Sequence, residues 1–277
     1  MAAASTAKLW RRLGDEFSSQ WVGVRSELSA VVERGRVASV RAALPYTAAV
    51  LAETRQDAPG VGGLVASRFV VTAPDGRSMT TLLDQSLISV KTAVKGGASV
   101  REALATGGTH LTRDVLTVLA DTRRQVYHAD IIQRPKLGGY ARMLNAPSCS
   151  RCVLLAGKWF AWNKGFQRHP RCDCIHIPAS EQVANDFRTD PADYFNGLSA
   201  AEQDRVFTKS GARAIRDGAD IGRVENIRMR GLGTAKAARQ YGTPSRLTVD
   251  DIYRVAGTRA NAIRLLTLEG YILPTFG

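Results

Sequence analysis

Apolar residues near the N-terminus recur every three or four positions, which is the spacing of one face of an α-helix. The stripe consists of Trp10, Leu13, Phe17, Trp21, Val24, Leu28 and Val31. It is typical of an amphipathic core helix, although a helical hairpin or a short coiled-coil seam has the same spacing. Pro45 interrupts the pattern, and we expect a second helical stretch to run to about Thr54.

The helical pattern ends before residue 59. The Gly-rich segment 59–63 predicts a linker. Arg68-Phe-Val-Val-Thr72 is rich in residues that favour strands, and it ends at Pro74-Asp-Gly76. We therefore expect a short β-strand followed by a turn.

Helical patterns then resume on both sides of a turn-rich middle. Ser99 with Glu102 predicts a capping box that begins a long helix, which should run to about His128. Ser199 with Glu202 predicts a second capping box.

The C-terminal pattern indicates short helices, the last two on either side of Gly257 within Thr248–Leu268. The expected fold is mainly α with a small β-containing Cys/His subdomain of the zinc type, α+β overall. We expect three regions: N-terminal helices over 1–58, a core over 64–190 that includes the Cys/His cluster at 140–178, and a basic helical region over 191–277.

Charge indicates the kind of partner. The net charge is +13 and the pI about 10.1, which favours a polyanion such as nucleic acid, although a basic protein without such a partner is the alternative. Residues 205–264 hold 13 Lys/Arg against 5 Asp/Glu, an excess of eight. We expect non-specific binding of double-stranded DNA there, through Arg213, Arg216, Arg223, Arg228, Arg230 and Arg254.

Membrane association is not expected. No stretch approaches the roughly 18 apolar residues that a membrane span needs. The first residues lack a basic segment followed by an apolar block, so we expect no signal peptide and synthesis in the cytosol. In that compartment, cysteines are more often metal ligands or thiols than disulfides.

All four cysteines fall between positions 149 and 174, in the patterns Cys-x-x-Cys and Cys-x-Cys, separated by 19 residues. Two such pairs supply the thiolates of a closed tetrahedral zinc site, which stabilises structure and leaves no catalytic position. Four reduced thiols without a metal are the alternative. The candidate ligands outnumber the four places: Cys149, Cys152, His169, Cys172 and Cys174, with His176 a further candidate.

These motifs are similar to those of a known protein family. The run from Pro147-Ser-Cys149-Ser-Arg-Cys152 through Lys158-Trp-Phe160 to Arg168-His169-Pro-Arg-Cys172-Asp-Cys174 resembles the signature of phage Mu F-like minor capsid (head morphogenesis) proteins, a Cys-x-x-Cys followed by His-Pro-x-Cys-x-Cys. The runs 201–220 and 252–272 are similar to versions from phages of actinobacteria. The resemblance covers roughly residues 65–272. Glu225 and Ile227 depart from the family's pattern.

The resemblance implies a low-copy structural protein of the phage head, and not an enzyme. Such proteins associate with the portal during assembly and are packaged in the capsid interior of the virion. Some members of the family bind DNA. The expected partners are therefore the portal protein, the capsid interior and double-stranded DNA, and the expected cofactor is one structural zinc.

Two alternatives remain. A zinc-stapled nuclease would need a His base and a further metal ligand on a following helix, but His169 is followed by Pro and cysteines, and no His lies beyond His176. A zinc-containing DNA-binding regulator could use Thr248–Leu268 as a helix-turn-helix, with Arg254, Arg259 and Arg264 outward. The apolar residues of this stretch are more simply explained as core: Ile252, Val255, Ile263, Leu265, Leu266 and Leu268.

Overall fold

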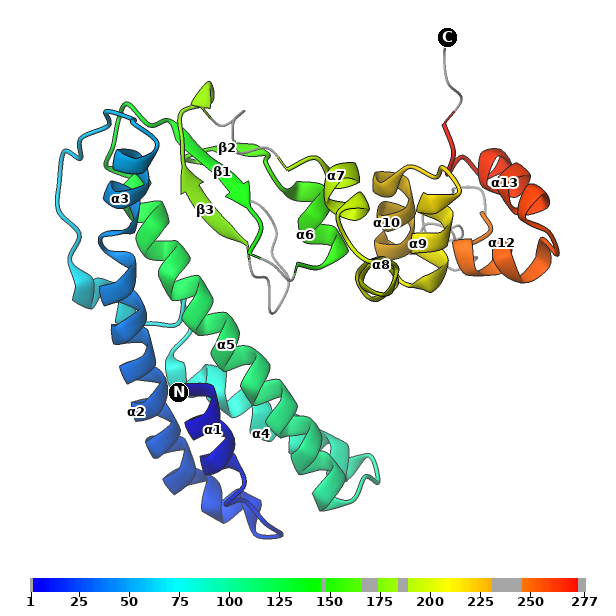
Figure 1. Ribbon diagram of the computed structural model, residues 1–277. Coiled ribbons are helices and arrows are strands. Elements are labelled where there is room, and N and C mark those ends of the chain that lie inside the picture. The colour runs from blue at the N-terminus through cyan, green and yellow to red at the C-terminus, as the bar shows by residue number, and fades with distance from the viewer. Residues whose placement is uncertain (1, 146–147, 166–173, 184–188, 231–245, 274–277) are drawn as a thin grey trace. The chain divides into compact units, whose positions relative to one another are not determined.

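The chain forms two compact units. The computed structural model describes residues 2–145, 148–165, 174–183, 189–230 and 246–273. It is mainly helical, at 64%, with one small three-stranded antiparallel sheet, which confirms the α+β class (Figure 1). Unit 1 comprises Met1–Arg142 and Trp159–Asp186; unit 2 comprises Met143–Lys158 and Phe187–Gly277. The three regions expected from the sequence stay a prediction.

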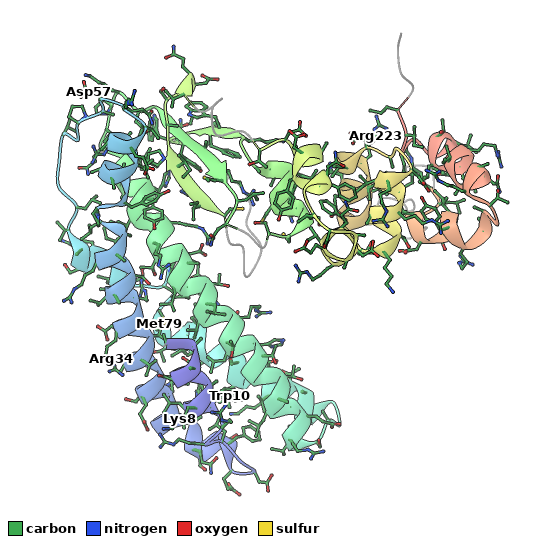
Figure 2. All side chains as sticks on the ribbon, in the orientation of Figure 1. Lys8, Trp10, Arg34, Asp57, Met79 and Arg223 are labelled. Atoms are coloured by element: carbon green, nitrogen blue, oxygen red, sulfur yellow. The ribbon has the colours of Figure 1, made fainter. Side chains whose placement is uncertain are left out.

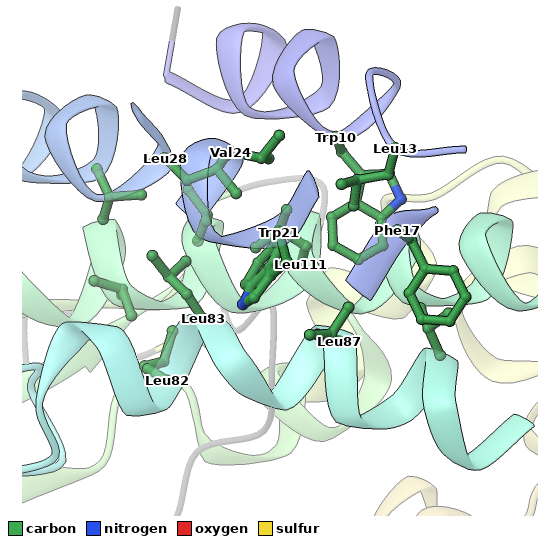
Figure 3. Packing of buried hydrophobic residues seen from close by; sticks show 14 of the residues in the cluster. Trp10, Leu13, Phe17, Trp21, Val24, Leu28, Leu82, Leu83, Leu87 and Leu111 are labelled. Atoms are coloured by element: carbon green, nitrogen blue, oxygen red, sulfur yellow. The ribbon is translucent and has the colours of Figure 1, made fainter. Parts of the chain in front are cut away.

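Unit 1 is a helical bundle that carries the sheet. Its helices are α1 (Ala2–Trp10), α2 (Phe17–Ala43), α3 (Tyr46–Glu53), the 3-10 helix η1 (Ala66–Val70), α4 (Met79–Lys95) and α5 (Val100–Ile132). Helices α1, α2, α4 and α5 enclose the main apolar core (Figure 3). Pro45 separates α2 from α3, as predicted.

The N-terminal stripe is buried as expected, but it belongs to two helices and not to one. The chain leaves helical geometry between Trp10 and Phe17. The break brings the rings of Trp10 and Trp21 edge to face, with centroids 5.8 Å apart. In one continuous helix these residues would lie about 16 Å apart along the axis. Further on, Val32 occupies the core position that the sequence assigned to Val31.

Trp10 lies on a part of α5 that has no side chains. The indole Nε1 donates to the carbonyl of Leu104 at 2.9 Å. A Cβ on Gly107 would lie 2.8 Å from the Trp10 ring and 2.5 Å from Val90 Cγ2, and a Cβ on Gly108 would lie 2.8 Å from the same ring. Two glycines inside a helix are unfavourable by themselves, and here they are needed for the close approach of α1 to α5.

The segment predicted as a strand, Arg68–Thr72, is not one, and that prediction is wrong. Residues 66–70 form η1 instead. The guanidinium of Arg36, on α2, is 2% exposed and donates to the carbonyls of Phe69 (2.6 Å), Val70 (3.2 Å) and Thr72. In a β-strand, successive carbonyl groups point to opposite sides of the chain. Here the carbonyls point to the same guanidinium, so the segment cannot be a strand. The turn at 74–76 is confirmed, with Gly76 at φ +87°.

The sheet has the strand order β2-β1-β3, with β1 Gly139–Met143, β2 Trp159–Ala161 and β3 Ile175–Pro178. Strands β1 and β2 are antiparallel, with Tyr140 opposite Phe160. Tyr140 also packs with Ile131 and Leu137 in a small core between the sheet and α5. The expected β-containing part therefore lies against the long helix.

Unit 2 is built of short helices: α6 (Ser150–Leu155), α7 (Pro191–Asn196), α8 (Ala200–Phe207), α9 (Lys209–Arg216), α10 (Ile221–Arg230), α12 (Val249–Val255) and α13 (Arg259–Leu268). One core gathers Val153, Phe195 and Phe207, and a second gathers α9, α10, α12 and α13 around Ile252 and Leu266.

The capping boxes and the C-terminal helix pair that the sequence predicts are present in the structure. Both capping boxes, at Ser99 and Ser199, are confirmed. The two short helices of Thr248–Leu268 are confirmed as α12 and α13, with Gly257 at φ +67° between them. Two residues assigned to the core there are exposed: Val255 at 52% and Leu268 at 72%. Only one face of each short helix contacts the rest of unit 2, and these side chains lie on the other.

We predict opposite effects for two helical glycines. Gly107→Ala should lower the free energy of unfolding by about 1–2 kcal/mol, because overpacking against Val90 and Trp10 exceeds the gain in helix propensity. Gly23→Ala, in α2, should raise it by about 0.5–1 kcal/mol, because its Cβ would meet nothing within 4 Å. Denaturant unfolding followed by circular dichroism measures both. Equal stabilisation by the two substitutions would show that Trp10 does not lie against Gly107.

Candidate metal ligands and basic surface

Two of the five candidate ligands lie at the start of α6, in unit 2. Cys149 is the N-cap residue and is exposed, whereas Cys152, one turn later, is buried. Residues three apart on a helix lie on neighbouring positions of its surface. The pair therefore brings two sulfurs of the type that zinc prefers to one end of a short helix.

A buried polar contact fixes this short helix. Ser150, between the two cysteines, donates its hydroxyl to the Glu225 carboxylate on α10 at 2.6 Å, and both side chains are buried. Val153 on the next turn packs against Phe195 and Phe207. Glu225, which departs from the Mu F-like pattern, thus holds the Cys-x-x-Cys segment in unit 2.

The other described cysteine belongs to unit 1. Cys174 is buried just before β3, and its carbonyl accepts a hydrogen bond of 2.9 Å from Nε of Arg124 on α5. His176, on β3, is also buried, with its ring stacked on Tyr140 at 4.2 Å between centroids. His128 lies 6.5 Å from that ring.

His169 and Cys172 lie outside the described residues. Within the ranges that are described, no group of three or more His, Cys, Asp or Glu side chains is arranged to hold a metal ion. Because two of the five candidates fall outside those ranges, this finding leaves the zinc site a prediction.

The basic residues of unit 2 differ in what neutralises them. Arg216 donates to Asp204 at 3.1 Å, and Arg254 donates to Asp251. Arg205 lies 4.0 Å from Glu202. Two of the six predicted DNA-binding residues, Arg216 and Arg254, are therefore already engaged with carboxylates in the fold, and their charge is partly cancelled.

Asp217 organises a second group of charges. Its carboxylate, 6% exposed, accepts from Arg259 Nε and from the Tyr253 hydroxyl, both at 2.7 Å. Burial opposes ionisation of Asp217, but these two hydrogen bonds hold its pKa below the usual value. Arg213 lies over the Tyr253 ring at 4.2 Å, a cation–π contact that leaves its guanidinium exposed.

Two more arginines cap the C-terminal end of α13. Arg223 donates to the Gly270 carbonyl at 2.8 Å, and Arg246 donates to the Glu269 carbonyl at 3.2 Å. Both side chains are exposed, and Arg223 is labelled in Figure 2. Arg228 and Arg230 belong to α10, but their side chains lie outside what the structure describes.

Among the described side chains of residues 189–273, five exposed cations make no ion pair with a carboxylate: Lys209, Arg213, Arg223, Arg246 and Arg264. Sequence reasoning named Arg213 and Arg223 but left Lys209 and Arg246 out. The Asp251–Arg254 spacing of three was the available signal that Arg254 is paired on its own helix.

Three other carboxylates on the helices are engaged with neighbouring side chains. Asp114 pairs with Arg113, and Asp121 with Arg124. Asp251 accepts from Thr248 and Arg254 at the start of α12. None of the helices in the described ranges is both long and apolar enough to cross a membrane.

Comparison with known proteins finds no matching family model, no matching curated protein and no matching solved structure. The family resemblance therefore rests on the sequence motifs alone.

Proposed function

We propose that this chain is a minor capsid (head morphogenesis) protein of a tailed bacteriophage. It is made in the host cytoplasm and resides in the capsid interior of the virion, where it associates with the portal protein and the packaged DNA. The observation that carries the proposal is the motif Cys149-x-x-Cys152 followed by His169-Pro-x-Cys172-x-Cys174. The long helices α2 and α5 agree with the helical N-terminal part usual in that family. The role is structural, and no residue is assigned a catalytic step.

We predict that the protein is present at low copy in purified virions. Quantitative mass spectrometry of particles banded in a density gradient measures its ratio to the major capsid protein. Protease-treated particles should retain it, because an interior protein is shielded by the shell. A chain that is missing from purified particles but protects a defined operator in a footprinting assay would instead be the zinc-containing regulator.

The DNA-binding part of the proposal rests on the cations of unit 2 that have no carboxylate partner. Phosphates compete poorly for a guanidinium that already binds a carboxylate in good geometry. Arg213 and Arg223 are therefore favoured over Arg216 and Arg254, and Lys209 and Arg264 join them. Contacts of this kind carry no sequence information, so binding should be non-specific.

We predict that the full-length protein binds random duplex DNA and loses at least about tenfold in affinity between 50 and 200 mM salt, because phosphate contacts release counterions. Lys209→Gln and Arg264→Gln should each reduce the slope of log affinity against log salt by about one. Arg216→Gln, matched in charge but paired with Asp204, should change the slope little.

Fluorescence anisotropy with a labelled random duplex measures these affinities, and an unlabelled duplex of unrelated sequence should compete equally. Folded protein that shows no binding at 50 mM salt would mean that the charge serves a protein partner. That result removes the DNA claim and leaves the capsid proposal in place.

The zinc part of the proposal assigns one structural ion per chain. Cys149 and Cys152 would supply two sulfurs from α6, and two more ligands would come from His169, Cys172 and Cys174. His176 is a weaker candidate, because its ring is stacked on Tyr140. A closed site of this kind would add to stability, and it would have no open coordination position for catalysis.

We predict about one zinc per chain in protein purified without added metal, measured by inductively coupled plasma mass spectrometry. Cys149→Ser should lower the free energy of unfolding by several kcal/mol, because metal-binding energy is folding energy in such sites. A chelator should destabilise the wild type and leave Cys149→Ser unchanged. Folded wild-type protein with a zinc content near zero would contradict the assignment.

A further inference from the structure

Helix α2 has a second face that the core does not use. Three adjoining hollows of about 480, 500 and 680 Å³ run along it, and all three are lined by Arg34. Together they form one groove, the α2 groove, which extends from Glu27 to Ala42 on α2 and is bordered by α1 and by α5. Its floor is made of small apolar side chains: Ala30, Val31, Ala38 and Ala42.

The lining of the α2 groove is basic. Lys8, Arg34, Arg41 and Arg123 line it, all four are exposed, and none makes a hydrogen bond or ion pair within the described part of the chain. Figure 2 labels Lys8 on α1 and Arg34 on α2.

The acidic residues of the groove do not balance this charge. Glu27 is paired with Arg12 at 2.7 Å. Glu33 is then the one carboxylate of the lining left against four cations. Fixed positive charge beside an apolar floor is an arrangement that a negatively charged, partly apolar surface complements.

The length and floor of the groove fit a helix. The span from Glu27 to Ala42 is about 22 Å, or four helical turns. Small side chains allow the backbone of a second helix to approach closely, and its apolar side chains at i, i+3, i+4 and i+7 would cover Val31 and the alanines. Arg34 and Arg41 are seven residues apart, two turns on one face, and would face acidic side chains at the same spacing.

We propose that the α2 groove binds an acidic amphipathic helix of a partner protein. Duplex DNA fits less well, because its phosphates would leave the apolar floor uncovered. A second copy of this chain fits less well, because a symmetric contact would oppose like charges. The proposal goes beyond the proposed function and does not depend on it, since it involves unit 1 and the DNA contacts involve unit 2.

The test uses the full chain and a fluorescein-labelled peptide of about 16 residues, four helical turns, with Leu at i, i+3, i+4 and i+7 and Glu at the flanking positions. Arg34→Glu with Arg41→Glu should weaken binding at least about tenfold, and the loss should shrink at high salt. Ala38→Gln should also weaken it about tenfold, because a polar side chain over the floor loses its water without gaining a partner.

Lys91→Glu with Lys95→Glu is the matched control. Both lysines are exposed on α4, outside the groove, and their reversal changes the net charge by the same amount, so it should leave peptide affinity unchanged. A scrambled peptide with dispersed leucines should bind at least about tenfold more weakly, because it has no continuous apolar face. Circular dichroism checks that each variant is folded.

Three results would overturn the proposal. Equal losses from the Lys91/Lys95 variant and from the Arg34/Arg41 variant would show diffuse charge attraction. A fall in affinity for a random duplex in the groove variants, with peptide binding unchanged, would make the groove a nucleic-acid surface. A dimer seen by sedimentation and abolished by Arg34→Glu would make the occupant a second copy.

Discussion

The buried guanidinium of Arg36 constrains how unit 1 is assembled. An arginine side chain carries five N–H donors and stays charged in proteins, so burying it requires acceptors on several sides. Burial lowers its pKa from the usual value, opposed by the nearby charge of Glu33. The acceptors are Thr122 Oγ1 on α5, at 3.1 Å, and the carbonyls of Phe69 and Val70 in η1 and of Thr72 just after it. Helix α2, helix α5 and the 66–72 segment therefore form one arrangement around a single cation.

This constraint explains which features could be predicted from the sequence. Capping boxes, Pro45 and Gly257 act through neighbouring residues, and the structure contains them where the pattern placed them. The strand predicted at Arg68–Thr72 failed because its carbonyls bind a residue more than thirty positions away. The helical hairpin was the alternative for the N-terminal stripe, but the apolar spacing did not place its break after Trp10, because the contact of Trp10 with Trp21 joins two helices.

In the candidate sites too, contacts between neighbouring residues could be predicted from the sequence, and contacts between distant residues could not. Spacing along the chain assigns the four cysteines to one zinc site, which stays a prediction; of the described cysteines, Cys152 is buried in unit 2 and Cys174 in unit 1. Among the arginines, the pairing of Arg254 could be read from its spacing to Asp251. The pairing of Arg259 with Asp217, 42 positions apart, could not. Net charge by itself overstates the number of guanidinium groups that remain for an anionic partner.

The path of the chain between the units has a consequence for synthesis. The chain leaves unit 1 after Arg142, contributes α6 to unit 2, returns for β2 and β3, and leaves again after Asp186. Neither unit is therefore complete until the ribosome has passed Asp186, although the helices up to Ile132 emerge much earlier. A stop codon just after Asp186 would leave α6 attached to unit 1 without the helices whose core it completes. Cleavage of one peptide bond at the first or the third crossing divides one of the two units, and cleavage at the second crossing divides both.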